Sequence, residues 1–450
     1  MLEEEVIVKS AKNSNESLLI INTLIMIAMP ALLFGGNCNV AAGLFIALGI
    51  VAPLNVLNYK RTWVDARAHT NLFYTIALAP CIISFAVAAF GIIDSPFWES
   101  DIGSRGYLSL QPARAGIIVS GALSSMGALM PELATISAAA CALSLFFVTE
   151  SRYIIRRIFF FASLFAAAIA VFGFIYSALE SIPRFMLPSF GRNAFGTFSD
   201  ASQWSAFAIL WLGASMTVAA YSSQRFRIFT YLYSLKFFSF SISVLLFLSV
   251  IFCGKPIDKI FAMVLTAFGC AVLFFDTIPT RANMTRHWTS KYIHGKYKKM
   301  RLSVPAIFYA LISVFLFAWA ASMLVGSAKN PQERVIATDG AEGAVSFAER
   351  MAVYEDCKPL LDMKPIFGWG TGSFTNVFAF KQGADLGDAP YATPFSDLLQ
   401  KLVENGYFGL ILTFLTPAFL FLRWLYKRDF SLSGSIIFMS AGLTLVLGVF

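Results

Sequence analysis

Long apolar runs separated by short polar stretches dominate the chain of 450 residues. A helix that crosses a membrane needs about 20 predominantly apolar residues. On that criterion the pattern predicts eleven spans, at 18–36, 40–57, 72–93, 132–149, 157–178, 205–222, 236–253, 259–278, 305–325, 407–424 and 431–450. A further run at 114–130 is rich in Gly and Ser, and we interpret it as a re-entrant or interfacial segment, with a twelfth span as the alternative. The predicted fold is therefore an all-α polytopic membrane protein with 11–12 transmembrane helices.

Composition agrees with this pattern. Hydrophobic residues make up 58% of the chain and charged residues only 13%, whereas soluble proteins have about 25% charged residues. The net charge of +8 is explained by Lys and Arg gathered on the cytoplasmic side, and no basic, aromatic-interleaved domain predicts a nucleic-acid partner. The six cysteines lack metal-binding spacing, and only a disulfide between Cys38 and Cys357 is left open.

One loop fixes the expected orientation. Residues 279–304 carry seven Lys and Arg residues and no acid, which places them in the cytoplasm. Counting spans from there puts 94–113, 179–204 and the segment after span 305–325 outside. The predicted organisation is a cytoplasmic N-terminus at 1–17 without a cleavable signal peptide, an N-terminal transmembrane bundle at 18–325, a large periplasmic functional loop at 326–406, and C-terminal transmembrane helices at 407–450.

The longest interval without a membrane-length apolar run is 346–410, where polar groups can meet a water-soluble substrate. Its first part has the apolar spacing of a helix and leads into PIFGWGTG, whose three alternating glycines predict a tight turn. A second helix is expected to start near Pro394, with Ser396 or Asp397 as its cap, and to stop at Asn405-Gly406. We therefore expect two helices that flank a glycine turn.

Arg350 in an apolar helix, followed by PIFGWGTGSF and SDLLQKLVENGYFG, resembles the signature region of the O-antigen ligase and polymerase superfamily of bacterial membrane proteins. The stretch FGRNAFGTFSDASQWSAFAIL, with Arg192, resembles a second region of that family. Members join a glycan carried on a polyprenyl diphosphate, such as undecaprenyl diphosphate, to an acceptor hydroxyl at the periplasmic face. The resemblance thus implies the inner membrane, no metal or cofactor, and four kinds of partner: the lipid-linked glycan, a glycan or lipid acceptor, membrane lipids and other polysaccharide-assembly proteins.

Such a transfer needs cations to hold the diphosphate, and arginine forks match phosphate oxygens. Arg350 and Arg192 are the leading substrate-binding candidates, and Arg184, Lys364 and Gln400 are further ones. The alternative for Arg350 is a structural ion pair with a neighbouring acid, Glu349, Glu355 or Asp356. For Arg192 the alternative is an interfacial arginine whose head lies among lipid headgroups.

The proton acceptor is where the resemblance breaks. Family ligases have a histidine just before the second helix, but Phe395 stands there, and the three histidines all fall in predicted cytoplasmic loops. Asp397 is the first replacement candidate and Glu404 the second, because Asp397, Gln400 and Glu404 share one helix face. Asp397 could instead be only the helix cap, and the glycines could bind phosphate through backbone amides or simply make the turn.

These patterns predict a membrane glycosyltransferase of the O-antigen ligase/polymerase type, with ligase versus polymerase left open. One alternative is a lipid-linked glycan transporter or flippase, which would have ionisable residues in the middle of its spans. The predicted spans are nearly free of charge away from their ends, and this disfavours the transporter. The other alternative is a non-catalytic relative within a polysaccharide-assembly complex, which the absent histidine favours.

Overall fold

The computed structural model describes the chain over a set of separate ranges. These are residues 20–28, 31–32, 46–47, 78–89, 97–102, 105–110, 132–141, 152–178, 195–198, 201–221, 234–277, 311–316, 318–319, 347–383, 394, 396–427 and 432–447. The chain divides into two compact units, residues 1–158 with 332–429 and 448–450, and residues 159–331 with 430–447.

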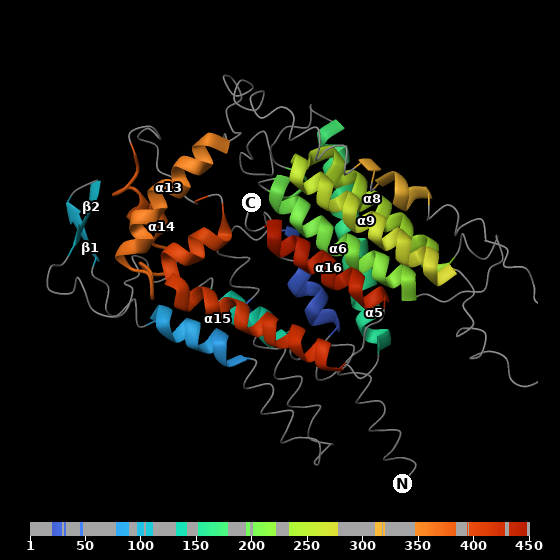
Figure 1. The fold of residues 1–450 in the computed structure, drawn as a ribbon, viewed down its shortest axis with the longest axis horizontal. Coiled ribbons are helices and arrows are strands. Elements are labelled where there is room, and N and C mark those ends of the chain that lie inside the picture. The colour runs from blue at the N-terminus through green and yellow to red at the C-terminus, as the bar shows by residue number, and fades with distance from the viewer. Residues whose placement is uncertain are drawn as a thin grey trace, which may run out of the picture. The chain divides into compact units, whose positions relative to one another are not determined.

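Helices make up most of the described residues (Figure 1). The named helices are α5 (Arg152–Ala178), α6 (Ala201–Tyr221), α8 (Leu235–Cys253), α9 (Pro256–Thr277), α13 (Phe347–Met363), α14 (Phe374–Phe378), α15 (Asp397–Lys427) and α16 (Leu432–Leu447). Shorter apolar helices run over Leu78–Ala89 and Glu132–Cys141.

Four of the described helices are long and apolar enough to cross a membrane: Ile154–Ser177, Ala201–Tyr221, Leu235–Cys253 and Pro256–Phe274. They coincide with the predicted spans 157–178, 205–222, 236–253 and 259–278. The chain is therefore a helical membrane protein. The number of its spans stays a prediction, because the other predicted runs, apart from 407–424 within α15, are described only in part.

A β-hairpin departs from the all-α expectation. Strands β1 (Phe97–Ile102) and β2 (Arg105–Leu110) pair antiparallel, with Phe97 opposite Leu110 and Ile102 opposite Arg105. Only two residues separate the paired ends, and their sequence Gly-Ser is typical of a two-residue hairpin turn. The hairpin lies in the predicted outer region 94–113, where no secondary structure was expected.

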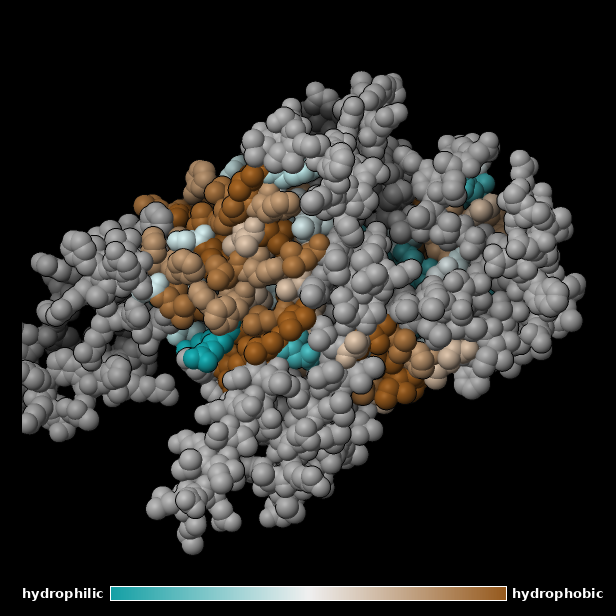
Figure 2. All heavy atoms as spheres, turned by 180° about the vertical axis from the view of Figure 1, so that it is seen from behind, coloured by the Kyte–Doolittle hydropathy of each residue, from teal (hydrophilic) through white to brown (hydrophobic). Residues whose placement is uncertain are grey.

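Helix α6 packs against α8, α9 and α16 in the second unit. Gly213 lets α16 approach closely, because a side chain there would overlap Ser440. Ser215 and Ser243 share a hydrogen bond of 2.6 Å between α6 and α8. Small residues and interhelical hydroxyl bonds of this kind join helices in lipid, where apolar burial supplies little drive for association. The described surface over this bundle is mostly hydrophobic, as a lipid-facing surface requires (Figure 2).

The first unit contains the predicted functional loop, and we call residues 347–383 together with 396–408 the loop unit. In it α13, α14 and the start of α15 contact one another. They enclose a hydrophobic core of Val353, Cys357, Leu360, Phe374, Val377, Phe378 and Val403. Cys357 is a free thiol with no exposed surface, and burial raises its pKa to about 12. The disulfide between Cys38 and Cys357 is therefore absent.

Helix α15 breaks at Gly406, where φ is 64° and ψ is −171°. The helix stop predicted at Asn405-Gly406 is thus confirmed, and the chain resumes a helical course from Tyr407 to Lys427 over the predicted span 407–424. A break of this kind frees backbone carbonyls before it and backbone amides after it, and these groups need other partners when they are buried.

The glycine turn, residues 365–372, supplies those partners. Four backbone hydrogen bonds join it to the break, from Trp369 N to Val403 O (3.0 Å), Gly370 N to Glu404 O (2.6 Å), Tyr407 N to Pro365 O (2.9 Å) and Phe408 N to Ile366 O (3.0 Å). Gly368 and Gly406 face each other across this contact, and a β-carbon on either would overlap the opposite backbone. Both have positive φ, so glycine is required at each position on two independent grounds.

We expect Gly406→Ala to disrupt the loop unit. The new methyl group would overlap the Ile366 carbonyl, and φ of 64° is unfavourable for alanine. Limited proteolysis of detergent-purified protein should show cleavage within 347–408 at least about tenfold faster than in wild type. Gly442→Ala in α16 is the matched control, because nothing lies within 4 Å of the added carbon. Equal cleavage rates for the two variants would contradict the interlocked arrangement.

Candidate functional site

Of the predicted site residues, Gln400 and Glu404 are in direct contact. Gln400 Nε2 donates to Glu404 Oε1 at 3.1 Å, one turn along α15. Ser396 caps this helix, since its Oγ accepts from the amide of Leu399. Asp397 is therefore not the cap: it is the first helical residue, and its side chain is exposed. The shared helix face is as predicted, with its solvent end at Asp397 and its buried end at Glu404.

The Glu404 carboxylate is only 4% exposed and lies against the glycine turn. It accepts hydrogen bonds from the backbone of Gly372 and Phe374 as well as from Gln400. Burial raises the pKa of Glu404, while these hydrogen bonds and the charge of Lys401 oppose the rise. The anion held by the amides of this turn is therefore a carboxylate of the chain itself.

This arrangement decides between the two interpretations of the alternating glycines. The amides of Trp369 and Gly370 donate to helix carbonyls, and those of Gly372 and Phe374 donate to Glu404. Four donors that a phosphate cradle would use are thus satisfied within the loop unit. The glycines serve turn geometry and close backbone approach.

Asp397 differs from Glu404 in being open to solvent. Partial desolvation by the surrounding protein raises the pKa of Asp397 above its usual value. A carboxyl group with a raised pKa and an exposed side chain is suited to accept a proton from an incoming hydroxyl. Of the two catalytic candidates, Asp397 is the accessible one.

Lys364 lies at the other end of the turn. Its ammonium group lies over the Trp369 ring, 4.7 Å from the ring centre, and Trp369 Nε1 donates to Leu360 O at 2.9 Å. Burial lowers the pKa of Lys364. The side chain of Lys364 is thus directed at an aromatic face within the loop unit.

The arginine candidates are less fully described. Arg350 lies in the first turn of α13, but its side chain is outside the described part of the structure, as are Arg184, Arg192 and Phe395 in full. One of the suggested ion-pair partners of Arg350 has a different bond: Asp356 Oδ2 accepts from the amide of Gly383 at 2.7 Å. The roles of the three arginines stay predictions.

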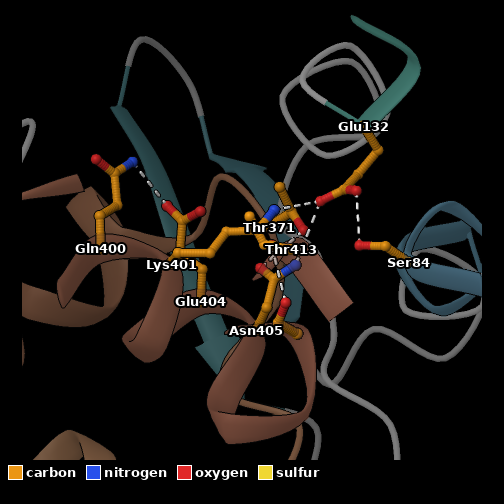
Figure 3. A network of polar contacts seen from close by, with 9 residues as sticks. Ser84, Glu132, Thr371, Gln400, Lys401, Glu404, Asn405 and Thr413 are labelled. Atoms are coloured by element: carbon orange, nitrogen blue, oxygen red, sulfur yellow. Dashed lines mark hydrogen bonds and ion pairs between the residues drawn. The ribbon is translucent and has the colours of Figure 1, made fainter. Parts of the chain in front are cut away.

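A buried network centred on Glu132 was not predicted (Figure 3). Glu132 is 1% exposed and begins the helix Glu132–Cys141. Its carboxylate accepts from Ser84 Oγ at 2.7 Å, Lys401 Nζ at 2.5 Å and Asn405 Nδ2 at 3.3 Å. The one signal in the sequence is a lone acid, after Pro131, at the start of an apolar run. Lys401 carried no signal, because a lysine in a predicted surface helix is ordinary.

Within the described ranges no group of three or more His, Cys, Asp and Glu side chains is placed to hold a metal ion. Comparison of the chain with protein-family models and with curated proteins finds no match.

Glu404 should make the stability of the loop unit depend on pH. Its raised pKa means that the folded unit binds a proton more tightly than the unfolded chain, so stability should increase as pH falls from 7 toward about 4.5. Thermal unfolding in detergent at several pH values measures this increase. The gain in stability on acidification should be smaller in Glu404→Gln. Asp397, whose pKa is also raised, should supply the gain that remains. An undiminished pH dependence in Glu404→Gln would contradict the assignment.

Proposed function

We propose that the chain is a membrane glycosyltransferase of the O-antigen ligase/polymerase type. In this proposal it transfers or polymerises glycan from a polyprenyl-diphosphate carrier onto an acceptor hydroxyl at the periplasmic face of a bacterial inner membrane. The observation that carries the proposal is the loop unit itself. Helix, glycine turn and helix occur in the order of the family signature, form one packed core, and lead across the break at Gly406 directly into the helix over span 407–424. A substrate with an aqueous glycan and a membrane-embedded tail needs a site at such a boundary.

The Glu132 network supports the proposed topology. Lys401 of the loop unit is bonded to Glu132 at the start of the helix Glu132–Cys141, so the two lie on the same side of the membrane. Six predicted spans lie between Glu132 and Lys401, and this even number places both residues on the same side of the membrane. The contact agrees with that count, which does not depend on whether 114–130 crosses the membrane.

The proposed chemistry assigns two tasks to this chain. The acceptor oxygen forms a bond to the anomeric carbon of the glycan while the bond from that carbon to the diphosphate oxygen breaks. Arg350, with Arg192 and Arg184 as further candidates, would bind the departing diphosphate through charge-assisted hydrogen bonds. The exposed Asp397 would take the proton of the acceptor hydroxyl. Gln400 and Glu404 hold the turn and helix in place.

The structure bears on the two alternative functions, a transporter and a non-catalytic relative, in opposite ways. A transporter would need ionisable groups in mid-span, but in the four described membrane-length helices every Asp, Glu, Lys and Arg lies in the first or last two turns. A non-catalytic relative gains support from Phe395 in place of the histidine and from the internal bonding of Glu404 and Gln400. It is therefore the second candidate.

Asp397→Asn tests the proposal in proteoliposomes that contain the purified protein, a polyprenyl-diphosphate-linked glycan and a glycan or lipid acceptor. Wild-type protein should release polyprenyl diphosphate, and Asp397→Asn should lower the rate by about 10²–10⁴-fold because the amide cannot take the proton. Folding should be retained, since Ser396 and not Asp397 caps the helix. Asp362→Asn, which changes another exposed aspartate of the loop unit, is the control and should leave the rate unchanged.

Phe395→His separates the two candidate functions. If wild-type protein is inactive with every donor and acceptor pair but Phe395→His transfers glycan, the chain is a non-catalytic relative that kept the ligase geometry. Full activity of Asp397→Asn would exclude Asp397 as the proton acceptor.

A further inference from the structure

Glu132 connects three segments that are far apart in the sequence. Its two carboxylate oxygens contact Ser84 from the helix Leu78–Ala89, and Lys401 and Asn405 from α15 (Figure 3). Lys401 and Asn405 are one turn apart on α15, so they present two donors to one carboxylate. Glu132 is also the first residue of the helix Glu132–Cys141, and the helix dipole favours a negative charge at that end.

Asn405 links Glu132 to the glycine turn. Asn405 donates to Glu132 and accepts from Thr371 Oγ1 through its own Oδ1 at 3.0 Å. Asn405 immediately precedes the break at Gly406. Glu132 is thereby linked by side-chain hydrogen bonds to the place where α15 and the glycine turn interlock.

The residues that Glu132 holds lie on the same helix as Asp397, the proposed proton acceptor. Asp397, Lys401 and Asn405 are spaced at i, i+4 and i+8, so they lie along one face of the first part of α15. Lys401 is held by the buried carboxylate one turn from Asp397. Fixing Lys401 and Asn405 therefore fixes the direction in which Asp397 is presented.

We propose that Glu132 is a positioning residue that clamps residues 397–405 to the helices Leu78–Ala89 and Glu132–Cys141. The effect on glycan transfer rests on the proposed function, whereas the clamp itself does not. A buried carboxylate with one ammonium and two neutral donors is fully satisfied, and removal of its charge leaves Lys401 without its counter-ion. The loop unit should then keep its own core but lose its fixed orientation.

Hydrogen exchange followed by mass spectrometry on the full-length protein in detergent tests the clamp without any substrate. In Glu132→Gln we expect exchange over 365–372 and 397–408 to be at least about tenfold faster than in wild type, with α6 and α8 unchanged. Asp362→Asn is the matched control and should exchange like wild type. In the same preparations, Glu132→Gln should lower kcat for glycan transfer by more than about tenfold with little change in KM for the donor, because chemistry depends on orientation more than binding does.

A charge exchange separates the clamp from a general loss of folding. Glu132→Lys and Lys401→Glu should each accelerate exchange over 397–408, and the double variant should restore much of the protection, because Ser84 and Asn405 can accept hydrogen bonds as well as donate them. Unchanged exchange in Glu132→Gln, or a uniform increase over all helices, would overturn the proposal, as would a double variant no better than the singles. The expected exchange pattern with no transfer by wild-type protein would support the clamp and overturn the proposed function.

Discussion

The loop unit depends on the interlock between a broken helix and a glycine turn. Breaking α15 at Gly406 leaves backbone groups that must be satisfied, and the glycine turn satisfies four of them. These four hydrogen bonds can form only because Gly368 and Gly406 carry no side chain where the two backbones meet. The part of α15 that follows the break, over the predicted span 407–424, and the candidate site are therefore joined through main-chain bonds, so the site keeps a fixed relation to the start of that helix.

Two buried carboxylates complete the arrangement in different ways. Glu404 holds the turn from within, by accepting backbone amides of Gly372 and Phe374. Glu132 holds the start of α15 from the helix Glu132–Cys141, through Lys401 and Asn405. Burial of a charge is costly unless it is paired or hydrogen-bonded, and both carboxylates meet that condition. Asp397, by contrast, is exposed, which is what a group that reacts with an external substrate requires.

The local features of the fold were accessible from sequence, and the long-range ones were not. The length of the apolar runs predicted the four membrane-length helices, Ser396 was one of two expected caps, and the stop at Gly406 followed from Asn405-Gly406. The hairpin at 97–110 was missed because its pattern is short and lies between apolar runs. Glu132 was missed because its partner Lys401 is 269 residues away, and neither residue is unusual in its own neighbourhood. The shared face of Asp397, Gln400 and Glu404 was predicted, but only the packing of the turn distinguishes the buried carboxylate from the exposed one.

The side of the membrane on which the loop unit lies is the most direct measurement, because the proposed chemistry requires the loop unit to be outside. Single cysteines introduced at Ala384 and at Ser290, in protein without its native cysteines, report the two sides when intact spheroplasts are treated with a membrane-impermeant maleimide. Position 384 should react and position 290, in the cationic loop 279–304, should react only after the membrane is permeabilised. Labelling of position 290 but not of position 384 would place the loop unit in the cytoplasm and contradict glycan transfer at the outer face.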